Sequence, residues 1–124
     1  MAGDRPKHLN LLQIRLPLPG VLSIFHRISG VLLILALPFF LGALQYSVKS
    51  QEGYDCVAQF FSHPLAKLVV WGAAWALFHH LCAGIRFLLL DLHIGVELAA
   101  ARASAAAAFV VSIVLTVIFG VWLW

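Results

Sequence analysis

The start of the first long apolar segment carries three side chains that can bind a polar ligand. His26 and Arg27 follow Ser23 by three and four positions, so a helix places all three on one face. A hydroxyl, an imidazole and a guanidinium that converge in this way can hold a carbonyl or a carboxylate group. Gly30 extends the same face and leaves room for a close partner. The alternative is an arginine that reaches the lipid headgroups, with neighbours that have no binding function.

A second candidate is His80, which lies inside another apolar segment. The residues within about 40° of His80 on a helical wheel are mostly small: Ala73, Ala76, Gly84, Phe87 and Asp91. Haem needs this arrangement, because the imidazole can bind iron and the small side chains leave a shallow groove for the flat ring. The alternative is a histidine that forms a hydrogen bond with a neighbouring helix.

The opposite side of the same segment is bulky, and the pattern predicts that it faces lipid. Its members are Trp71, Trp75, Phe78, Cys82, Ile85 and Leu89. His79 is rotated by about 100° from His80. We interpret His79 as a residue that packs against another helix.

Long apolar segments must position these residues. The predicted membrane spans are at about 21–46, 65–90 and 103–124, after a polar N-terminal arm at 1–20. At about 1.5 Å per residue, each span can cross a hydrocarbon core of about 30 Å. The polar stretches between them predict connecting loops at 47–64 and 91–102. The run Ala105–Ala108 allows another helix to approach the last span closely.

The composition requires a lipid environment. Of the 124 residues, 63% are hydrophobic and 10% are charged, against about 45–50% and about 25% in soluble domains. A chain of this size cannot hide so much apolar surface from water. The net charge of +3 does not indicate a nucleic-acid partner, because the basic residues form no run. The two cysteines form no CxxC pair, so no disulfide framework is predicted.

The distribution of lysine and arginine predicts how the chain is oriented. Six of these residues lie on the side of the N-terminal arm and the second loop: Arg5, Lys7, Arg15, Arg27, Arg86 and Arg102. Only Lys49 and Lys67 lie on the other side. Because cytoplasmic loops carry an excess of basic residues, we expect the N-terminus in the cytoplasm and the C-terminus in the periplasm.

Three stretches together resemble the b-type cytochrome membrane-anchor subunit of succinate dehydrogenase, respiratory complex II. They are Arg5-Pro6 leading through Leu9 and Leu11, Ser23-x-x-His26-Arg27-x-Ser29-Gly30, and His80-x-x-x-Gly84-Ile85-Arg86-Phe87-Leu88-x-x-Asp91. The resemblance covers essentially the whole chain, and the motifs occur in order within the expected spans. It implies a location in a bacterial cell inner membrane.

The resemblance also implies roles for single residues. His80 matches the position that supplies one axial ligand to haem b. Ser23 and Arg27 match positions that line the ubiquinone pocket, while His26 and Arg27 match positions near the haem propionates. Arg86 and Asp91 match the motif without an assigned role. Some members carry a histidine where this chain has Phe87, so any contact of that histidine is absent here.

A haem b with two axial histidines needs more than this chain provides. His80 is one well-placed ligand, whereas His26 lies too near the membrane edge to be the second. The resemblance implies that a second small membrane-anchor subunit supplies the other ligand. The chain has no flavin fingerprint and no cysteine set for iron–sulfur clusters, so these groups belong to a flavoprotein subunit and an iron–sulfur subunit.

The sequence thus predicts an all-α membrane protein, a bundle of three transmembrane helices completed by a second anchor subunit. Its expected function is to anchor succinate:ubiquinone oxidoreductase, an enzyme that works only as the assembled complex. Two alternatives remain open. One is the haem-bearing anchor of a fumarate reductase or of another membrane dehydrogenase. The other is a small structural or channel-like protein without a cofactor.

Overall fold

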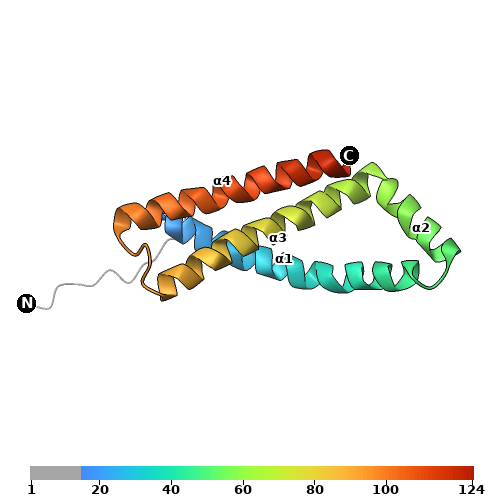
Figure 1. Cartoon of the computed structure of the whole chain (residues 1–124), viewed down its shortest axis with the longest axis horizontal. Helices are drawn as coiled ribbons and strands as arrows, with labels where there is room; N and C mark the ends of the chain where they lie inside the picture. The colour runs from blue at the N-terminus through green and yellow to red at the C-terminus, as the bar shows by residue number, and fades with distance from the viewer. Residues whose placement is uncertain (1–14) are drawn as a thin grey trace, which may run out of the picture.

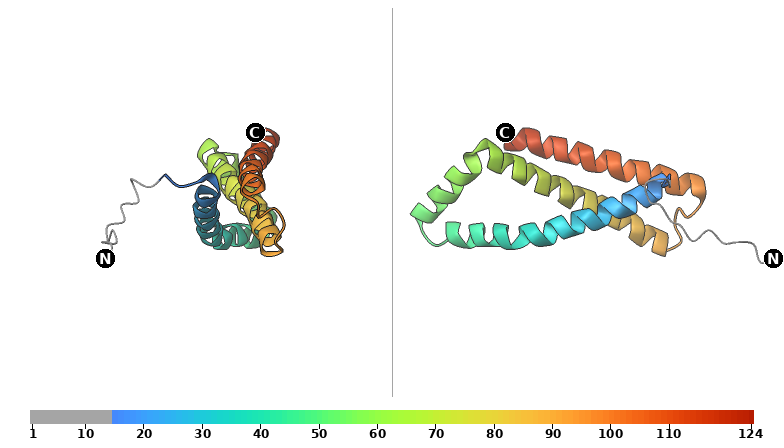
Figure 2. Two further views of the ribbon diagram at one scale, coloured as in Figure 1. Left: turned by 90° about the vertical axis from the view of Figure 1, so that its left-hand side faces the viewer. Right: turned by 180° about the vertical axis from the view of Figure 1, so that it is seen from behind.

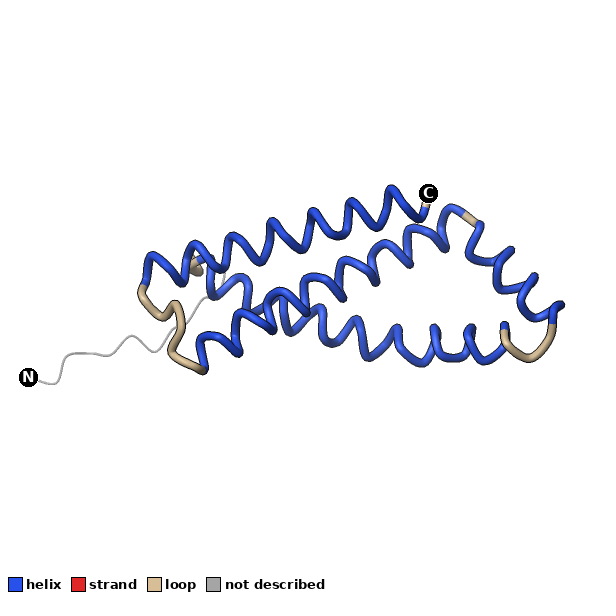
Figure 3. Tube along the Cα trace, viewed as in Figure 1, coloured by secondary structure: helices blue, strands red, loops and turns tan. Residues whose placement is uncertain are grey.

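The computed structural model describes residues 15–124 as four helices joined by short turns (Figure 1). Helix α1 spans Leu18–Ser47, α2 spans Gln51–Ser62, α3 spans Pro64–Asp91 and α4 spans Leu98–Leu123. No strand occurs in this part of the chain (Figure 3). The all-helical prediction is therefore confirmed. The Arg5-Pro6 stretch and most of the N-terminal arm lie outside the described residues.

The helices α1, α3 and α4 are long and apolar enough to cross a membrane. They contain 30, 28 and 26 residues, which corresponds to about 39–45 Å at about 1.5 Å per residue. Most of their large apolar side chains are exposed, as a surface in contact with lipid requires. The buried apolar cluster is small and consists of Leu22, Ala83, Ala105 and Ala108. The predicted membrane bundle is borne out in this respect.

Helix α4 begins at Leu98, several residues before the predicted span at 103–124. The charge on Arg102 interrupts the apolar run, but it does not interrupt the helix. Residues 98–101 are Leu-Ala-Ala-Ala, and alanine and leucine are strong helix formers. The predicted loop at 91–102 is consequently shorter, because only residues 92–97 separate α3 from α4.

The predicted loop at 47–64 is wrong, because most of it forms α2. The Ser50 hydroxyl caps this helix by accepting a hydrogen bond from the Gly53 amide at 3.0 Å. Gly53 also packs on the end of α1, where a Cβ atom would lie 2.5 Å from the Tyr46 carbonyl oxygen. The helix bridges α1 and α3 at one end of the molecule (Figure 2). One face of α2 stays exposed, which explains its polar composition.

Four phenylalanines fasten α2 to α1. Phe40 stacks on Phe61 with ring centroids 6.1 Å apart and planes inclined by 10°. Phe39 contacts both Phe60 and Phe61 at 6.1 and 6.2 Å. Aromatic pairs at these distances stabilise an interface beyond the burial of their area. This cluster therefore holds α2 across the open end of the α1–α3 pair.

The bulky side of α3 differs from the prediction of a lipid-facing surface. The Trp71 indole Nε1 donates a hydrogen bond to the Thr116 carbonyl oxygen of α4 at 2.8 Å. Cys82 packs against the buried apolar cluster. Ile85, Leu89 and Trp71 remain exposed, at 51%, 41% and 38%, so half of this side still agrees with the prediction. A large apolar side chain is equally compatible with lipid and with a helix, so its type alone does not decide which it contacts.

Helix α4 presents small residues to this bulky side. Ala105 is fully buried and Ala108 is 7% exposed, which confirms that this run admits a close neighbour. Three α3 side chains form interhelical polar contacts with α4, and we call these contacts the α3–α4 seam. Its members are Trp71 with Thr116, His79 with Ser112, and Arg86 with Ser104 and Ala101.

Arg86 forms the end of the seam nearest the α3–α4 turn. Its Nε donates to the Ser104 hydroxyl and its Nη2 donates to the Ala101 carbonyl oxygen, both at 2.9 Å. The side chain is only 6% exposed. Polar groups buried in a membrane need such partners. The structure thus gives Arg86 a role in joining α3 to the first turns of α4.

Candidate functional site

Helices α1 and α3 cross where His26 and His80 meet. The two imidazole rings stack with centroids 4.2 Å apart and planes inclined by 13°. Each histidine also lies beside a glycine of the other helix. A Cβ atom on Gly30 would lie 3.0 Å from His80 Cε1, and one on Gly84 would lie 3.5 Å from His26 Nε2. The glycines therefore allow the crossing, and the close partner expected at Gly30 is His80.

A hydrogen bond to the backbone holds the His80 ring in place. Its Nδ1 lies 3.1 Å from the His26 carbonyl oxygen. A carbonyl oxygen can only accept, so Nδ1 carries a proton, and in the neutral ring Nε2 then keeps its lone pair. Within residues 15–124, no hydrogen bond involves Nε2. A histidine that binds a metal commonly has this arrangement, because the second N–H holds the ring in place.

Ser29 supports the same contact, and the sequence pattern did not single it out as a site residue. It is fully buried. Its hydroxyl donates to the His26 carbonyl oxygen at 2.8 Å and lies 3.3 Å from His80 Nδ1. The sequence signal that could have identified Ser29 is its position directly before Gly30, on the helix that crosses α3 at His80. Its position three residues after His26 allows the hydroxyl to bond back to that carbonyl.

An apolar cavity of about 610 Å³ adjoins His80. Its walls come from α1, α3 and α4 and include Gly30, Leu37, Ala73, Leu77 and Phe119. The predicted small-residue stripe contributes Ala73 to this wall, whereas Ala76 is buried in the bundle. Cofactor pockets have about 300–1,000 Å³ and mostly apolar walls. The size and lining therefore suit a large flat ligand next to an imidazole.

These residues fit one side of a haem. In the described part of the chain, no group of three or more His, Cys, Asp or Glu side chains can hold a metal ion. A haem requires only axial ligands from the protein, since the porphyrin supplies the others. His80 lines the cavity and has one imidazole nitrogen without a hydrogen bond within residues 15–124. The arrangement is that of half a site.

Ser23 and Arg27 lie close to the beginning of α1, on the same side as His26. Arg27 is exposed and Ser23 is half-buried. Neither side chain forms a hydrogen bond within residues 15–124, and none links them to His80. They lie within about 14 Å of the start of α1 at Leu18, at about 1.5 Å per residue. The Ser23 hydroxyl and the Arg27 guanidinium can therefore donate hydrogen bonds to a ligand near one end of the membrane helices.

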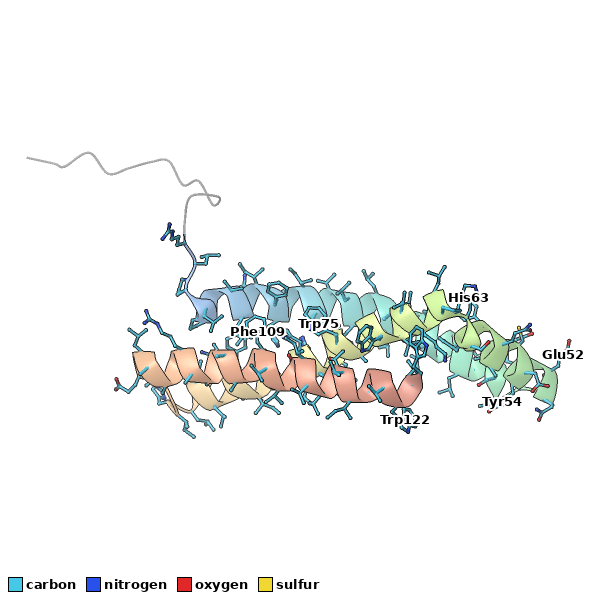
Figure 4. The ribbon with its side chains drawn as sticks, turned by 90° about the horizontal axis from the view of Figure 1, so that it is seen from above. Glu52, Tyr54, His63, Trp75, Phe109 and Trp122 are labelled. Atoms are coloured by element: carbon cyan, nitrogen blue, oxygen red, sulfur yellow. The ribbon has the colours of Figure 1, made fainter. Side chains whose placement is uncertain are left out.

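His79 has surroundings that differ completely from those of its neighbour. It is fully buried between α1, α3 and α4. Its ring stacks on Trp75 at 5.3 Å and contacts Phe109 at 5.0 Å and Phe25 at 6.1 Å. Figure 4 shows Trp75 and Phe109 near the middle of the bundle. The interpretation of His79 as a residue that packs against another helix agrees with this position.

Comparison with known proteins gives consistent matches. Residues 1–119 match the family described as the succinate dehydrogenase/fumarate reductase transmembrane subunit. The succinate dehydrogenase cytochrome b556 subunit of Coxiella burnetii is 38% identical over 125 positions, which cover all of both chains. The same subunit of Paracoccus denitrificans is 34% identical over 116 positions, 94% of this chain and 89% of that protein. That of Rickettsia felis is 32% identical over 119 positions, with coverage of 96% and 93%.

Proposed function

Because this chain belongs to the family of succinate dehydrogenase and fumarate reductase transmembrane subunits, we propose that His80 ligates a haem b and that Ser23 and Arg27 form part of a ubiquinone site. The chain is the membrane anchor, or cytochrome b subunit, of a succinate dehydrogenase. The relatives named above are all succinate dehydrogenase subunits, which favours succinate oxidation over fumarate reduction. Family membership also argues against a cofactor-free channel.

One observation supports the haem proposal most strongly. His80 lines the apolar cavity and donates from Nδ1 to the His26 carbonyl oxygen, which leaves its Nε2 without a hydrogen bond within residues 15–124. A bound haem b supplies reversible one-electron chemistry to the membrane part of the complex. His80 would hold the iron, and His26 and Arg27 would offset the negative charge of the propionates. A second small anchor subunit would provide the other protein ligand.

The quinone proposal rests on donors and charge near the membrane edge. Quinone is apolar apart from its two carbonyl groups, so its site needs an apolar entry and a few hydrogen-bond donors. Ser23 offers a hydroxyl donor and Arg27 offers five N–H donors with a fixed positive charge. Quinone gains negative charge as it is reduced, and Arg27 stabilises that charge more than it stabilises neutral quinone. This difference accelerates reduction.

The proposed orientation connects this site to the soluble subunits. Six basic residues on one side favour a cytoplasmic N-terminus and a cytoplasmic α3–α4 turn. Ser23 and Arg27 then lie near the cytoplasmic surface of the inner membrane, where an iron–sulfur subunit docks. Electrons from succinate pass from the flavoprotein subunit through the iron–sulfur subunit to quinone. The C-terminus and α2 lie on the periplasmic side.

The haem proposal is tested by a reduced-minus-oxidised visible spectrum of the purified complex. We expect His80→Leu to abolish or strongly change the low-spin b-type band. The matched control is His93→Asn, because His93 is exposed and its φ of 61° suits asparagine. A normal band in His80→Leu, from a complex with all subunits present, would show that another residue ligates the iron.

A further inference from the structure

The rotation of α3 about its own axis decides where His80 lies, and hydrophobicity does not fix this rotation. Exposed large apolar residues occur on several sides of α3, among them Leu65, Val69, Leu77, Leu81 and Leu88. In lipid, apolar side chains give no driving force between helices, so polar contacts and small residues set the packing. The α3–α4 seam consists of such contacts, and its middle member, His79, directly precedes His80.

The hydrogen bond of His79 has a defined direction. The Ser112 hydroxyl donates its single hydrogen to the Phe109 carbonyl oxygen at 2.9 Å. It must therefore accept from His79 Nδ1, which lies 3.4 Å away. Nε2 of His79 is buried and has no hydrogen-bond partner within the described residues. A buried polar atom without a partner is costly, so an apolar ring of similar shape would be the easier choice for filling this space.

We propose that His79 is a positioning residue, whose hydrogen bond to Ser112 fixes the rotation of α3 and thereby the orientation of the His80 imidazole. This inference rests on the proposed role of His80 as a haem ligand. The two side chains project about 100° apart from adjacent positions of one helix. With His79 anchored on α4, His80 is turned toward α1 and the His26 carbonyl oxygen. Metal sites require their ligands within about 0.5 Å and about 10–20° of the productive geometry.

Two substitutions at residue 79 separate positioning from space filling. His79→Asn keeps an N–H donor near the Nδ1 position but reduces the volume. His79→Phe keeps an aromatic ring against Trp75 and Phe109 but removes the donor. If the hydrogen bond matters, Asn resembles the native protein and Phe does not. If only packing matters, the order is reversed.

The measurement is the electron paramagnetic resonance spectrum of the oxidised low-spin haem in the purified complex, because its largest g value depends on how the axial imidazoles are oriented. We expect His79→Phe and Ser112→Ala to displace this g value in the same direction while haem content stays near one per complex. The double variant should show no further displacement, since both changes remove one interaction. His79→Asn should retain the native value.

Ser62→Ala is the control, because the Ser62 hydroxyl also bonds to a carbonyl three residues earlier but has no partner on another of the described helices. The proposal is overturned if Ser112→Ala leaves the g value unchanged, if the two displacements add, or if Asn is displaced and Phe is native. Should His79→Phe fail to assemble, Ser112→Ala and His79→Asn decide alone. A normal haem signal in His80→Leu would instead refute the ligand assignment, whatever the His79 variants show.

Discussion

At the scale of single residues, neighbouring histidines on α3 have opposite surroundings. His80 lies beside an open apolar cavity and keeps one nitrogen free, whereas His79 is enclosed by aromatic rings. The same nitrogen is the donor in both rings, because in each case Nδ1 donates to an oxygen of another helix. The candidate iron ligand is therefore distinguished from its neighbour by the open cavity that it lines, and not by which nitrogen donates.

Arg27→Gln should impair quinone reduction far more than electron transfer to a dye. Loss of the fixed charge removes stabilisation of reduced quinone, while a dye acceptor takes electrons from the soluble subunits. Quinone-linked and dye-linked succinate oxidation are measured on the same membranes. The control is Arg102→Gln, which removes an exposed arginine at the same end of the molecule. Equal loss of both activities would mean that Arg27 holds the complex together instead.

Ser23→Ala should reduce quinone-linked activity more mildly. The hydroxyl contributes one hydrogen bond to a quinone carbonyl, and losing it costs about 1–3 kcal/mol. The Michaelis constant for quinone and the turnover number are measured separately. Ser47→Ala is the control, because among residues 15–124 that hydroxyl bonds only to the Leu44 carbonyl oxygen. Unchanged kinetics in both Ser23→Ala and Arg27→Gln would support the simpler role of an arginine that reaches the headgroups.

At the scale of helices, the α1–α3 crossing depends on glycine. Gly30→Ala places a Cβ atom 3.0 Å from His80 Cε1, so the helices must separate or the imidazole must turn. We expect lower haem content in the purified complex. Gly42→Ala in the same helix is the matched control, because nothing lies within 4 Å of its added Cβ atom. Equal haem content in the two variants would show that the crossing tolerates a methyl group.

The sequence predicts the three long helices because apolar runs of this length have few alternatives to a membrane. It fails at α2, since the polar residues at 47–64 suggested a loop, although Ser50, Gly53 and Glu52 form a helix start. The assignment of the bulky side of α3 to lipid was wrong in part, because Cys82 packs in the bundle and Trp71 bonds to α4. Tryptophan contacts lipid and helices equally well, so only the small residues of α4 reveal which occurs.

Part of the candidate site could also be predicted from the contrast between residue types along the chain. His80 and Gly30 stand out because polar or small residues are conspicuous among large apolar ones. The function of Ser29 depends on which helix crosses at its position, and a single sequence does not contain that information. The His79–Ser112 contact joins residues 33 positions apart. Pairings of this range follow from tertiary packing rather than from local spacing.

At the scale of the whole molecule, the native cysteines allow the orientation to be tested. Cys56 is exposed on α2 and Cys82 is half-buried within a membrane helix. We expect a membrane-impermeant maleimide to label Cys56 in intact spheroplasts, because α2 should lie on the periplasmic side. Cys56→Ser should abolish the labelling. Modification only after the membranes are broken would reverse the orientation and move the quinone site to the other surface.

The crossing of α1 and α3 has a mechanical consequence. The helices touch at Gly30 and His80, and they diverge from there toward α2, as Figures 1 and 2 show. A bilayer of altered thickness changes the tilt of the helices, which displaces the divergent ends near α2 most and the crossing point least. Complexes in thin and thick nanodiscs should therefore have the same haem spectrum. A distance between labels on the ends of α1 and α3 nearest α2 should change.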